Sequence, residues 1–303
     1  MSKKTAFIAG RKSLRKMALL RGVQLYKCIA CKKQFLGGIR LSNEVLWQEY
    51  VVGKQTYKQL AIRYSCSVKT IQRRLDKIKF IPAKLIANGV AVLMDTTYFG
   101  RGFGVMLFKD AYSGKNLYKV YVKTETNKHY ADGISYLVKQ GFTIKAIVCD
   151  GRRGLLQLFP AIPIQMCQFH QVAIIRRYLT KKPKMQASKE LWEHVLFLSK
   201  TDKESFEGGL KAWHNKWIDF LNERKLDPQG KNRYVHKRLR SAYRSLKTNL
   251  PWLFTWYDNI HLKIPNTTNA IDGHFADLKN KLRNHNGLSA TRKRKFIDEF
   301  LKA

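Results

Sequence analysis

The stretch Val90-Ala91-Val92-Leu93-Met94-Asp95 decides how this chain folds. An unbroken apolar run of this length, bounded by Gly89 and Asp95, is typical of a strand buried on both faces. A second run, Ile144-Lys145-Ala146-Ile147-Val148-Cys149, is followed at once by Asp150. We therefore expect two buried strands, each with a carboxylate at its end.

The residues around these runs predict an alternation of strands and helices. The further predicted strands cover residues 104–110, 117–122 and 164–167, and the predicted helices cover residues 127–140 and a segment from 168. The expected order, β-β-β-α-β-α-β-α, which includes a helix between the last two strands, is of the α/β class and resembles the ribonuclease H-like fold. In that fold the first and fourth strands lie side by side, so the resemblance implies that Asp95 and Asp150 converge.

A third carboxylate, Asp272, lies one turn into a helix that is expected to begin near Asn269. In a strongly basic chain, carboxylates at two strand ends are best explained by divalent metal ions bound beside a polyanion. Each acid also has an ordinary explanation. Asp95 would cap a turn at residues 96–97, and Asp150-Gly151 is a common turn dipeptide. Asp272 would complete a capping interaction with Asn269. The three together favour a metal site.

The composition predicts a nucleic-acid partner. The 303 residues include 58 Lys and Arg against 21 Asp and Glu, and a polyanion would relieve the self-repulsion of a formal charge of +37. With 45% hydrophobic residues the chain still forms sizeable cores, and its length suggests two or three domains. No stretch is apolar enough to cross a bilayer, and five cysteines at this size do not indicate a disulfide framework. We therefore expect a cytoplasmic protein with no membrane partner.

Residues 41–80 predict a helix-turn-helix domain. A first helix at 43–52 is followed by two short helices, which Thr56 and Ser67 are placed to cap. The apolar positions of the first helix are Val45, Leu46, Tyr50 and Val51, and those of the last helix are Val68, Ile71 and Leu75.

The outward face of the last helix is polar and basic. Such a face would enter the major groove of DNA, and its residues are Lys69, Thr70, Gln72, Arg73 and Arg74. A three-helix core with a solvated basic face is the alternative, and the total charge favours DNA binding.

Residues 1–40 form a basic segment with 11 Lys or Arg and no acid. Within it, Cys28 and Cys31 have the Cys-x2-Cys spacing of one zinc-ribbon knuckle. A closed zinc site needs four ligands, and the sequence offers no second Cys pair or nearby His. A vestigial knuckle or a plain basic loop is therefore favoured over bound zinc.

Three motifs together resemble the Mutator-like DDE transposases of bacterial insertion sequences. They are Asp150-Gly151-Arg152-Arg153-Gly154, Met166-Cys167-Gln168-Phe169-His170 and Thr267-Thr268-Asn269-Ala270-Ile271-Asp272. A helix-rich segment with no strand signal, at about 171–262, separates the last two motifs, as a helical insertion does in the family. The resemblance covers essentially the whole chain. Two features depart from it, because Asp272 stands where the family has Glu and the first zinc knuckle is absent.

The resemblance implies a ribonuclease H-like catalytic domain over residues 88–303, with the insertion inside it and the helix-turn-helix before it. The implied activity is Mg-dependent (or Mn-dependent) cleavage at the terminal inverted repeats of a mobile element, followed by strand transfer into target DNA. The catalytic residues would be Asp95, Asp150, Asp272 and His170, with the three aspartates as metal ligands and with Arg152 and Arg153 holding the DNA backbone. Pairing of two element ends implies a homodimer or a larger assembly, associated with the bacterial nucleoid.

Other classes of protein stay open. One is a non-catalytic helix-turn-helix protein, or a decayed transposase that retains only recognition of the element's ends. Another is a ribonuclease H-like nuclease, which would cleave without joining. A ribosome-associated structural protein is disfavoured by the positions of the aspartates.

Overall fold

The computed structural model describes residues 14–20, 23–36, 41–78 and 86–302. These residues form two compact units. The first comprises the described residues up to 78 together with residues 281–296, and the second comprises residues 86–280 and 297–302. The beginning of the predicted basic segment, and residues 79–85 near the junction of the two later predicted domains, lie outside the described residues.

The first unit begins with a three-stranded antiparallel sheet in the order β1-β2-β3. Its strands are β1 (Leu14–Leu20), β2 (Val23–Cys28) and β3 (Gln34–Leu36). Tyr26 and Phe35 pair across β2 and β3, and their rings stack with centroids 6.0 Å apart. We did not predict this sheet from the sequence, because β1 is exposed beyond its first residue and shows no alternation of buried side chains.

Three helices follow, as predicted, and they are α2 (Asn43–Val51), α3 (Tyr57–Arg63) and α4 (Val68–Asp76). Thr56 and Gln59 close a capping box at the start of α3, in which each side chain accepts a hydrogen bond from the other residue's backbone N–H. Ser67 accepts a hydrogen bond from the N–H of Thr70 and so caps α4. Local side-chain signals therefore fix where these helices begin.

Two of the apolar positions named from the sequence lie outside the interior of these helices. Val45 is 51% exposed, because the buried residues of α2 lie on the opposite side of that helix. Val68 is 37% exposed at the first residue of α4, before the helix enters the core. The indole of Trp47, which we did not predict to be inside, is buried.

Residues 281–296 complete the first unit with the end of α11 (Asn269–Arg283) and the start of α12 (Ala290–Leu301). The ring of Tyr50 contacts those of His285 and Phe296, with centroids 4.3 and 5.7 Å apart. Arg292 pairs with Asp76 at 2.7 Å. A segment near the end of the chain thus shares a core with the helix-turn-helix.

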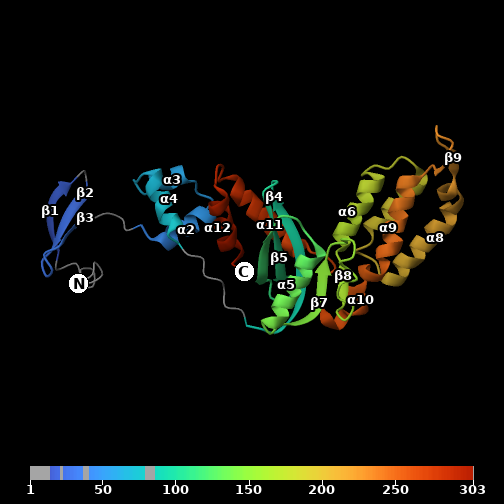
Figure 1. The fold of residues 1–303 in the computed structure, drawn as a ribbon, viewed down its shortest axis with the longest axis horizontal. Coiled ribbons are helices and arrows are strands. Elements are labelled where there is room, and N and C mark those ends of the chain that lie inside the picture. Colours follow the sequence, from blue (N-terminus) through green and yellow to red (C-terminus); the bar gives the residue numbers. More distant parts are fainter. Residues whose placement is uncertain (1–13, 21–22, 37–40, 79–85, 303) are drawn as a thin grey trace. The chain divides into compact units, whose positions relative to one another are not determined.

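The second unit is built on a five-stranded mixed sheet in the order β6-β5-β4-β7-β8 (Figure 1). The strands are β4 (Gly89–Phe99), β5 (Phe103–Asp110), β6 (Asn116–Val122), β7 (Thr143–Cys149) and β8 (Ile164–Met166). β4, β5 and β6 are antiparallel neighbours, whereas β7 runs parallel to both β4 and β8. The sheet therefore resembles a ribonuclease H-like core, with the first and fourth of its strands side by side. The helix that the predicted order placed between the last two strands is wrong, because the described residues 150–163 join β7 to β8 without one.

Asp95 does not end its strand, contrary to the prediction. β4 continues to Phe99 because it pairs with β5 as far as Phe99 and Phe103. The expected turn at residues 96–97 does not exist, so Asp95 is not a turn cap. What ends near Asp95 is the parallel pairing with β7, whose last pair is Leu93 and Val148.

The two faces of the sheet carry different side chains. One face packs into the main core, to which α5 (Asn127–Lys139) also contributes. Gly133 of α5 permits this packing, because a Cβ at that position would lie 2.0 Å from the ring of Phe108. The opposite face of β4 carries Leu93 and, one step further along, Asp95.

The helices between residues 168 and 262 gather beside the β8 edge of the sheet (Figure 1). They are α6 (Gln168–Leu179), α7 (Gln186–Leu196), α8 (Lys203–Asn222), α9 (Lys237–Leu253), α10 (Thr255–Asp258) and the short 3-10 helix η2 (Ile260–Leu262). Trp213 is buried there and donates its indole N–H to the carbonyl of Ala187 at 3.0 Å. Among the described residues, every helix is too short or too polar to cross a lipid bilayer.

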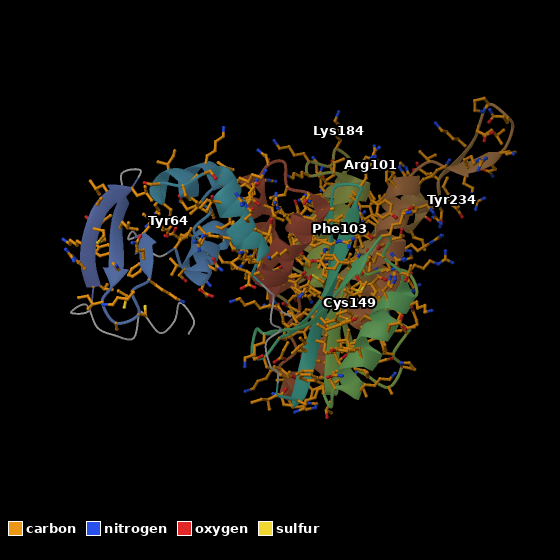
Figure 2. The ribbon with its side chains drawn as sticks, turned by 60° about the vertical axis from the view of Figure 1, so that its left-hand side comes forward. Tyr64, Arg101, Phe103, Cys149, Lys184 and Tyr234 are labelled. Atoms are coloured by element: carbon orange, nitrogen blue, oxygen red, sulfur yellow. The ribbon has the colours of Figure 1, made fainter. Side chains whose placement is uncertain are left out.

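The expectation of no strand in the insertion is wrong. A hairpin of β9 (Arg224–Leu226) and β10 (Asn232–Tyr234) joins α8 to α9. Its turn is closed by the carboxylate of Asp227, which accepts backbone N–H groups of the turn. The ring of Tyr234, labelled in Figure 2, lies close to the guanidinium groups of Arg224 and Arg240. Strands of three residues are too short to give a periodic signal, and only the turn at residues 227–230 could have indicated them.

Candidate active site

Asp95, on β4, and Asp150, directly after β7, lie at the same level of two neighbouring parallel strands. β4 and β7 stay in register up to Leu93 and Val148, and each aspartate is two residues beyond its member of that pair. Since side chains alternate along a strand, both aspartates belong to the face that carries Leu93 and Val148. Adjacent strands are about 4.8 Å apart, so this register brings the two acids together.

Asp272 reaches the same place from the start of α11. Its negative charge raises the pKa of Asp95, as does that of Asp150, so the three carboxylates act on one another electrostatically. The hydroxyl of Thr268 donates a hydrogen bond to Asp272 Oδ2 at 3.2 Å and fixes this side chain. The partner of Asp272 in the structure is thus Thr268, and not Asn269 as the capping alternative required.

Thr268 also joins Asp272 to the Cys-x2-His motif. The backbone N–H and the hydroxyl of Thr268 both lie 3.3 Å from Cys167 Sγ, and the hydroxyl lies 3.5 Å from His170 Nδ1. Cys167 and Thr268 are buried, whereas His170 is half-buried. The start of α6 and the start of α11 are therefore held together directly beside the aspartates.

Burial raises the pKa of Asp95 to about 7. A hydrogen bond from the N–H of Thr96 opposes this effect, and so does the charge of His170, while the charges of Asp272 and Asp150 reinforce it. In the metal-free protein Asp95 therefore keeps its proton up to about neutral pH, because its ionisation would bury a charge beside two other carboxylates. A bound cation would favour the ionised form.

The pKa of His170 is raised to about 9, chiefly by a hydrogen bond with Cys167, against the effect of burial. The charges of Cys167, Asp95 and Asp272 add to the rise. Burial acts to raise the pKa of the Cys167 thiol, but hydrogen bonds with His170 and Thr268 outweigh it and leave that pKa lowered. In the metal-free protein His170 is therefore a cation that faces the carboxylates.

The donor atoms fit Mg²⁺ or Mn²⁺, although they do not form a preassembled cage. Among the described residues, no three His, Cys, Asp or Glu side chains come together as a ready-made metal site. Mg²⁺ prefers oxygen ligands and is usually bound by one or two carboxylates, with water and substrate phosphates as the remaining ligands. A cluster of carboxylates meets that requirement without a complete protein cage.

Arg152 and Arg153 have different surroundings. The N–H of Arg152 donates to Asp150 Oδ1 at 3.2 Å, so the ordinary turn role of Asp150 is also present. The guanidinium group of Arg152 donates to Asn127 Oδ1 at 2.8 Å and to the carbonyl of Glu125 at 2.9 Å. Arg152 thus holds the loop that follows β7, whereas Arg153 is exposed.

The predicted DNA-reading residues of α4 are divided in a similar way. Lys69 and Arg73 are exposed, and Thr70 and Gln72 are half-buried. Arg74 differs from the prediction, because it is half-buried and donates a hydrogen bond to the carbonyl of Leu41 at 2.9 Å. Arg74 therefore supports the packing of the three helices.

Cys28 and Cys31 are neighbours at the end of β2. Hydrogen bonds to the backbone and thiol of Cys31 lower the pKa of Cys28, which is buried. In the part of the chain that the structure describes, no third ligand joins them. The preference for a vestigial knuckle or a basic loop over bound zinc stays a prediction.

Two features beside the aspartates were not recognised from the sequence. Thr268 stands four residues before Asp272, and this helical spacing was the available signal. Tyr130 is buried and donates to Glu125 Oε1 at 2.7 Å, and its hydroxyl lies 3.1 Å from that of Thr96, next to Asp95. No local pattern indicates this second network, because its members come from separate elements.

No protein-family model matches the chain, and no curated protein matches it. Among solved structures, it is similar to the cryoEM structure of the simian T-cell lymphotropic virus intasome in complex with PP2A regulatory subunit B56 gamma. The identity is 11%, the match covers 66% of this chain and 68% of that chain, and the TM-score is 0.22. It is also similar to the Drosophila P element transposase strand transfer complex, with 12% identity, 86% and 73% coverage and a TM-score of 0.34. With TM-scores this low, neither likeness bears on the roles of individual residues.

Proposed function

We propose that this protein is a DDE-type transposase, which cuts DNA at the ends of a mobile element and joins the freed ends to target DNA. The convergence of Asp95, Asp150 and Asp272 at the end of the parallel strand pair supports this function more than any other observation. The charge of +37 and the helix-turn-helix support a DNA substrate.

Each group of residues has a part in this proposal. Asp95, Asp150 and Asp272 would hold Mg²⁺ or Mn²⁺. The metal, when bound, supplies the Lewis acidity that activates water or a 3′-hydroxyl and stabilises the leaving oxygen at phosphorus. His170 presents a positive charge to the carboxylates, and Arg153 would contact the DNA backbone. The exposed face of α4 would select the element's terminal repeats.

A non-catalytic DNA-binding protein is the second candidate. The lack of a preassembled three-ligand metal group within the described residues favours it. Both candidates predict the same DNA binding. They differ only in whether the aspartates bind metal and support cleavage.

A cleavage and joining assay separates the two candidates. The substrate is a DNA fragment that carries the sequences flanking the gene, incubated with the purified protein and Mg²⁺ or Mn²⁺. The wild type should nick and join it, and Asp95→Asn should lose about a hundred- to a thousandfold in rate, because several kcal/mol of transition-state stabilisation depend on the metal. Asp132→Asn, which removes an exposed carboxylate from α5, is the matched control and should behave like the wild type. Equal rates for Asp95→Asn and Asp132→Asn, with duplex binding retained in both, would refute the proposal.

A further inference from the structure

A groove starts at Asp150 and runs between the loop after β7 and the helices α6 and α9. It consists of two cavities of about 550 and 440 Å³, and Gly151 and Arg152 line both of them. The first cavity also reaches His170, and the second reaches Asn249. Each volume is that of a small-molecule site, which suits one nucleotide at a time and not the paired bases of a duplex.

Arginines from three elements line this groove. Arg176 and Arg177 belong to α6, Arg244 belongs to α9, and Arg153 belongs to the loop after β7. All four are exposed, and among the described residues no hydrogen bond or ion pair to the protein engages their guanidinium groups. Stabilisation of the C-terminal end of α6 explains Arg176 and Arg177 alone. It does not explain why Arg153 and Arg244, from two other elements, line the adjoining second cavity.

The groove also offers an aromatic ring on a rigid floor. Tyr178 lines the second cavity and is 36% exposed. The buried Gln171 of α6 accepts a hydrogen bond from Asn249 at 2.8 Å and donates one to Ser245 at 3.3 Å, and both partners are on α9. The two helices are thereby fixed side by side, so the groove exists before any ligand binds.

We propose that this groove binds a single DNA strand, with its arginines on successive phosphates and Tyr178 stacked on a base. Exposed cations that follow a narrow channel, combined with an aromatic platform, are the usual means of holding single-stranded nucleic acid without sequence preference. This identification of the strand rests on the proposed function. The bound strand would be the continuation of the DNA whose phosphate is cut beside Asp150. Sequence selection would then belong to the helix-turn-helix, and the groove would direct an unpaired strand to the aspartates.

The first test measures stacking on Tyr178. An oligothymidylate of about 8 nucleotides, within the usual site size, carries one 2-aminopurine and is titrated with the full-length protein in EDTA. Binding should quench the 2-aminopurine fluorescence, and Tyr178→Ala should reduce the affinity about tenfold, the typical loss for one stacked base. Tyr136→Ala, at an exposed tyrosine of α5, should leave the affinity unchanged. Equal affinities for Tyr178→Ala and the wild type would overturn the proposal.

The second test counts phosphate contacts. The double variant Arg177→Gln/Arg244→Gln should reduce the slope of log affinity against log salt by about 1.4, since each phosphate contact on a single strand contributes about 0.7. A control double variant, Arg101→Gln/Lys211→Gln, removes the same charge from exposed positions of the same unit and should keep the wild-type slope. If the slope fell equally in both double variants, the change would be due to net charge alone, and the proposal would be overturned. An equal loss of affinity for a blunt duplex in the groove variant would also overturn it.

The two proposals fail separately, because the binding tests contain no metal. Oligothymidylate binding that depends on Tyr178, in a protein that neither cuts nor joins DNA, would refute the transposase and leave the groove in place. Cleavage that depends on Asp95, with no effect of the groove variants on binding, would refute the groove alone.

Discussion

The helix-turn-helix and the aspartate cluster are built in opposite ways. In the helix-turn-helix, the start of each helix is fixed by residues that are close in sequence. At the start of α3, for example, Thr56 and Gln59 satisfy each other's backbone N–H groups. The cluster joins Asp95, Asp150 and Asp272 from three distant parts of the chain and places like charges beside one another. One region is locally consistent, and the other is electrostatically unfavourable without a ligand.

This difference shows where the chain departs from the most stable arrangement. Folded proteins usually violate a stabilising rule only at sites that act on something else. Burial of a carboxylate next to two others costs stability, whereas a capped helix gains it. The comparison therefore predicts that matching variants in the two regions change stability with opposite signs.

The largest effect is expected from Asp95→Asn in the metal-free protein. The pKa of Asp95 in the folded state is about 7, above the value of about 3.9 for an unfolded aspartate. Between these pH values the unfolded state loses its proton while the folded state keeps it, so the free energy of unfolding falls as pH rises. Asn does not titrate, and the variant should therefore gain about 2–4 kcal/mol over the wild type between pH 4 and pH 8.

Urea unfolding in EDTA, followed by tryptophan fluorescence, measures this gain. All tryptophans except Trp47 lie in residues 192–256, so the signal reports on the second unit. Asp132→Asn should follow the wild-type pH dependence. A pH dependence of Asp95→Asn that matches the wild type would show that Asp95 is not buried among like charges.

A smaller effect is expected from His170→Gln. The charge of His170 lowers the pKa of Asp95, so its removal should raise that pKa further. Metal binding requires the ionised carboxylate, and the pH midpoint of Mn²⁺ binding should therefore rise by up to about one unit. His261→Gln, at an exposed histidine, should leave the midpoint in place. An unchanged or lower midpoint in His170→Gln would exclude an electrostatic role for this residue.

The smallest effect is expected in the helix-turn-helix, where Thr56→Ala should cost about 1 kcal/mol through loss of the helix cap. The loss should be the same at pH 5 and pH 8, because no titrating group takes part in the capping box. Hydrogen exchange of the α3 amides measures it, and Lys58→Ala, outside the cap, should change stability by less than about 0.5 kcal/mol. A strong pH dependence of the Thr56→Ala effect would remove the contrast between the two regions.

The sequence predicts which helices and strands exist better than it predicts the residues at which they begin and end. The strand at 90–94 was recognisable because it is buried on both faces, and the helices after Thr56 and Ser67 because their caps are local. The extension of β4 to Phe99 was not recognisable, because it depends on pairing with β5. The strands β1 and β9 lack buried alternation, being largely exposed, and gave no signal.

The same limit applies to the candidate site. The three aspartates could be selected from their places after or near apolar runs, and from a family resemblance. The contacts of Thr268 with Cys167 and Asp272 depend on where α6 and α11 begin in space, which no periodicity encodes. The groove of arginines likewise appears only when α6 and α9 are placed side by side.

Mn²⁺ binding, measured by electron paramagnetic resonance in the presence of oligothymidylate at pH 8, tests whether the three aspartates form one metal site. The wild type and Asp132→Asn should bind Mn²⁺ alike, while Asp95→Asn and Asp272→Asn should each lose more than about tenfold in affinity, the loss known even for residues that only support metal ligands. Equal Mn²⁺ affinity in the wild type and Asp95→Asn would contradict the metal site, and would leave a basic DNA-binding protein.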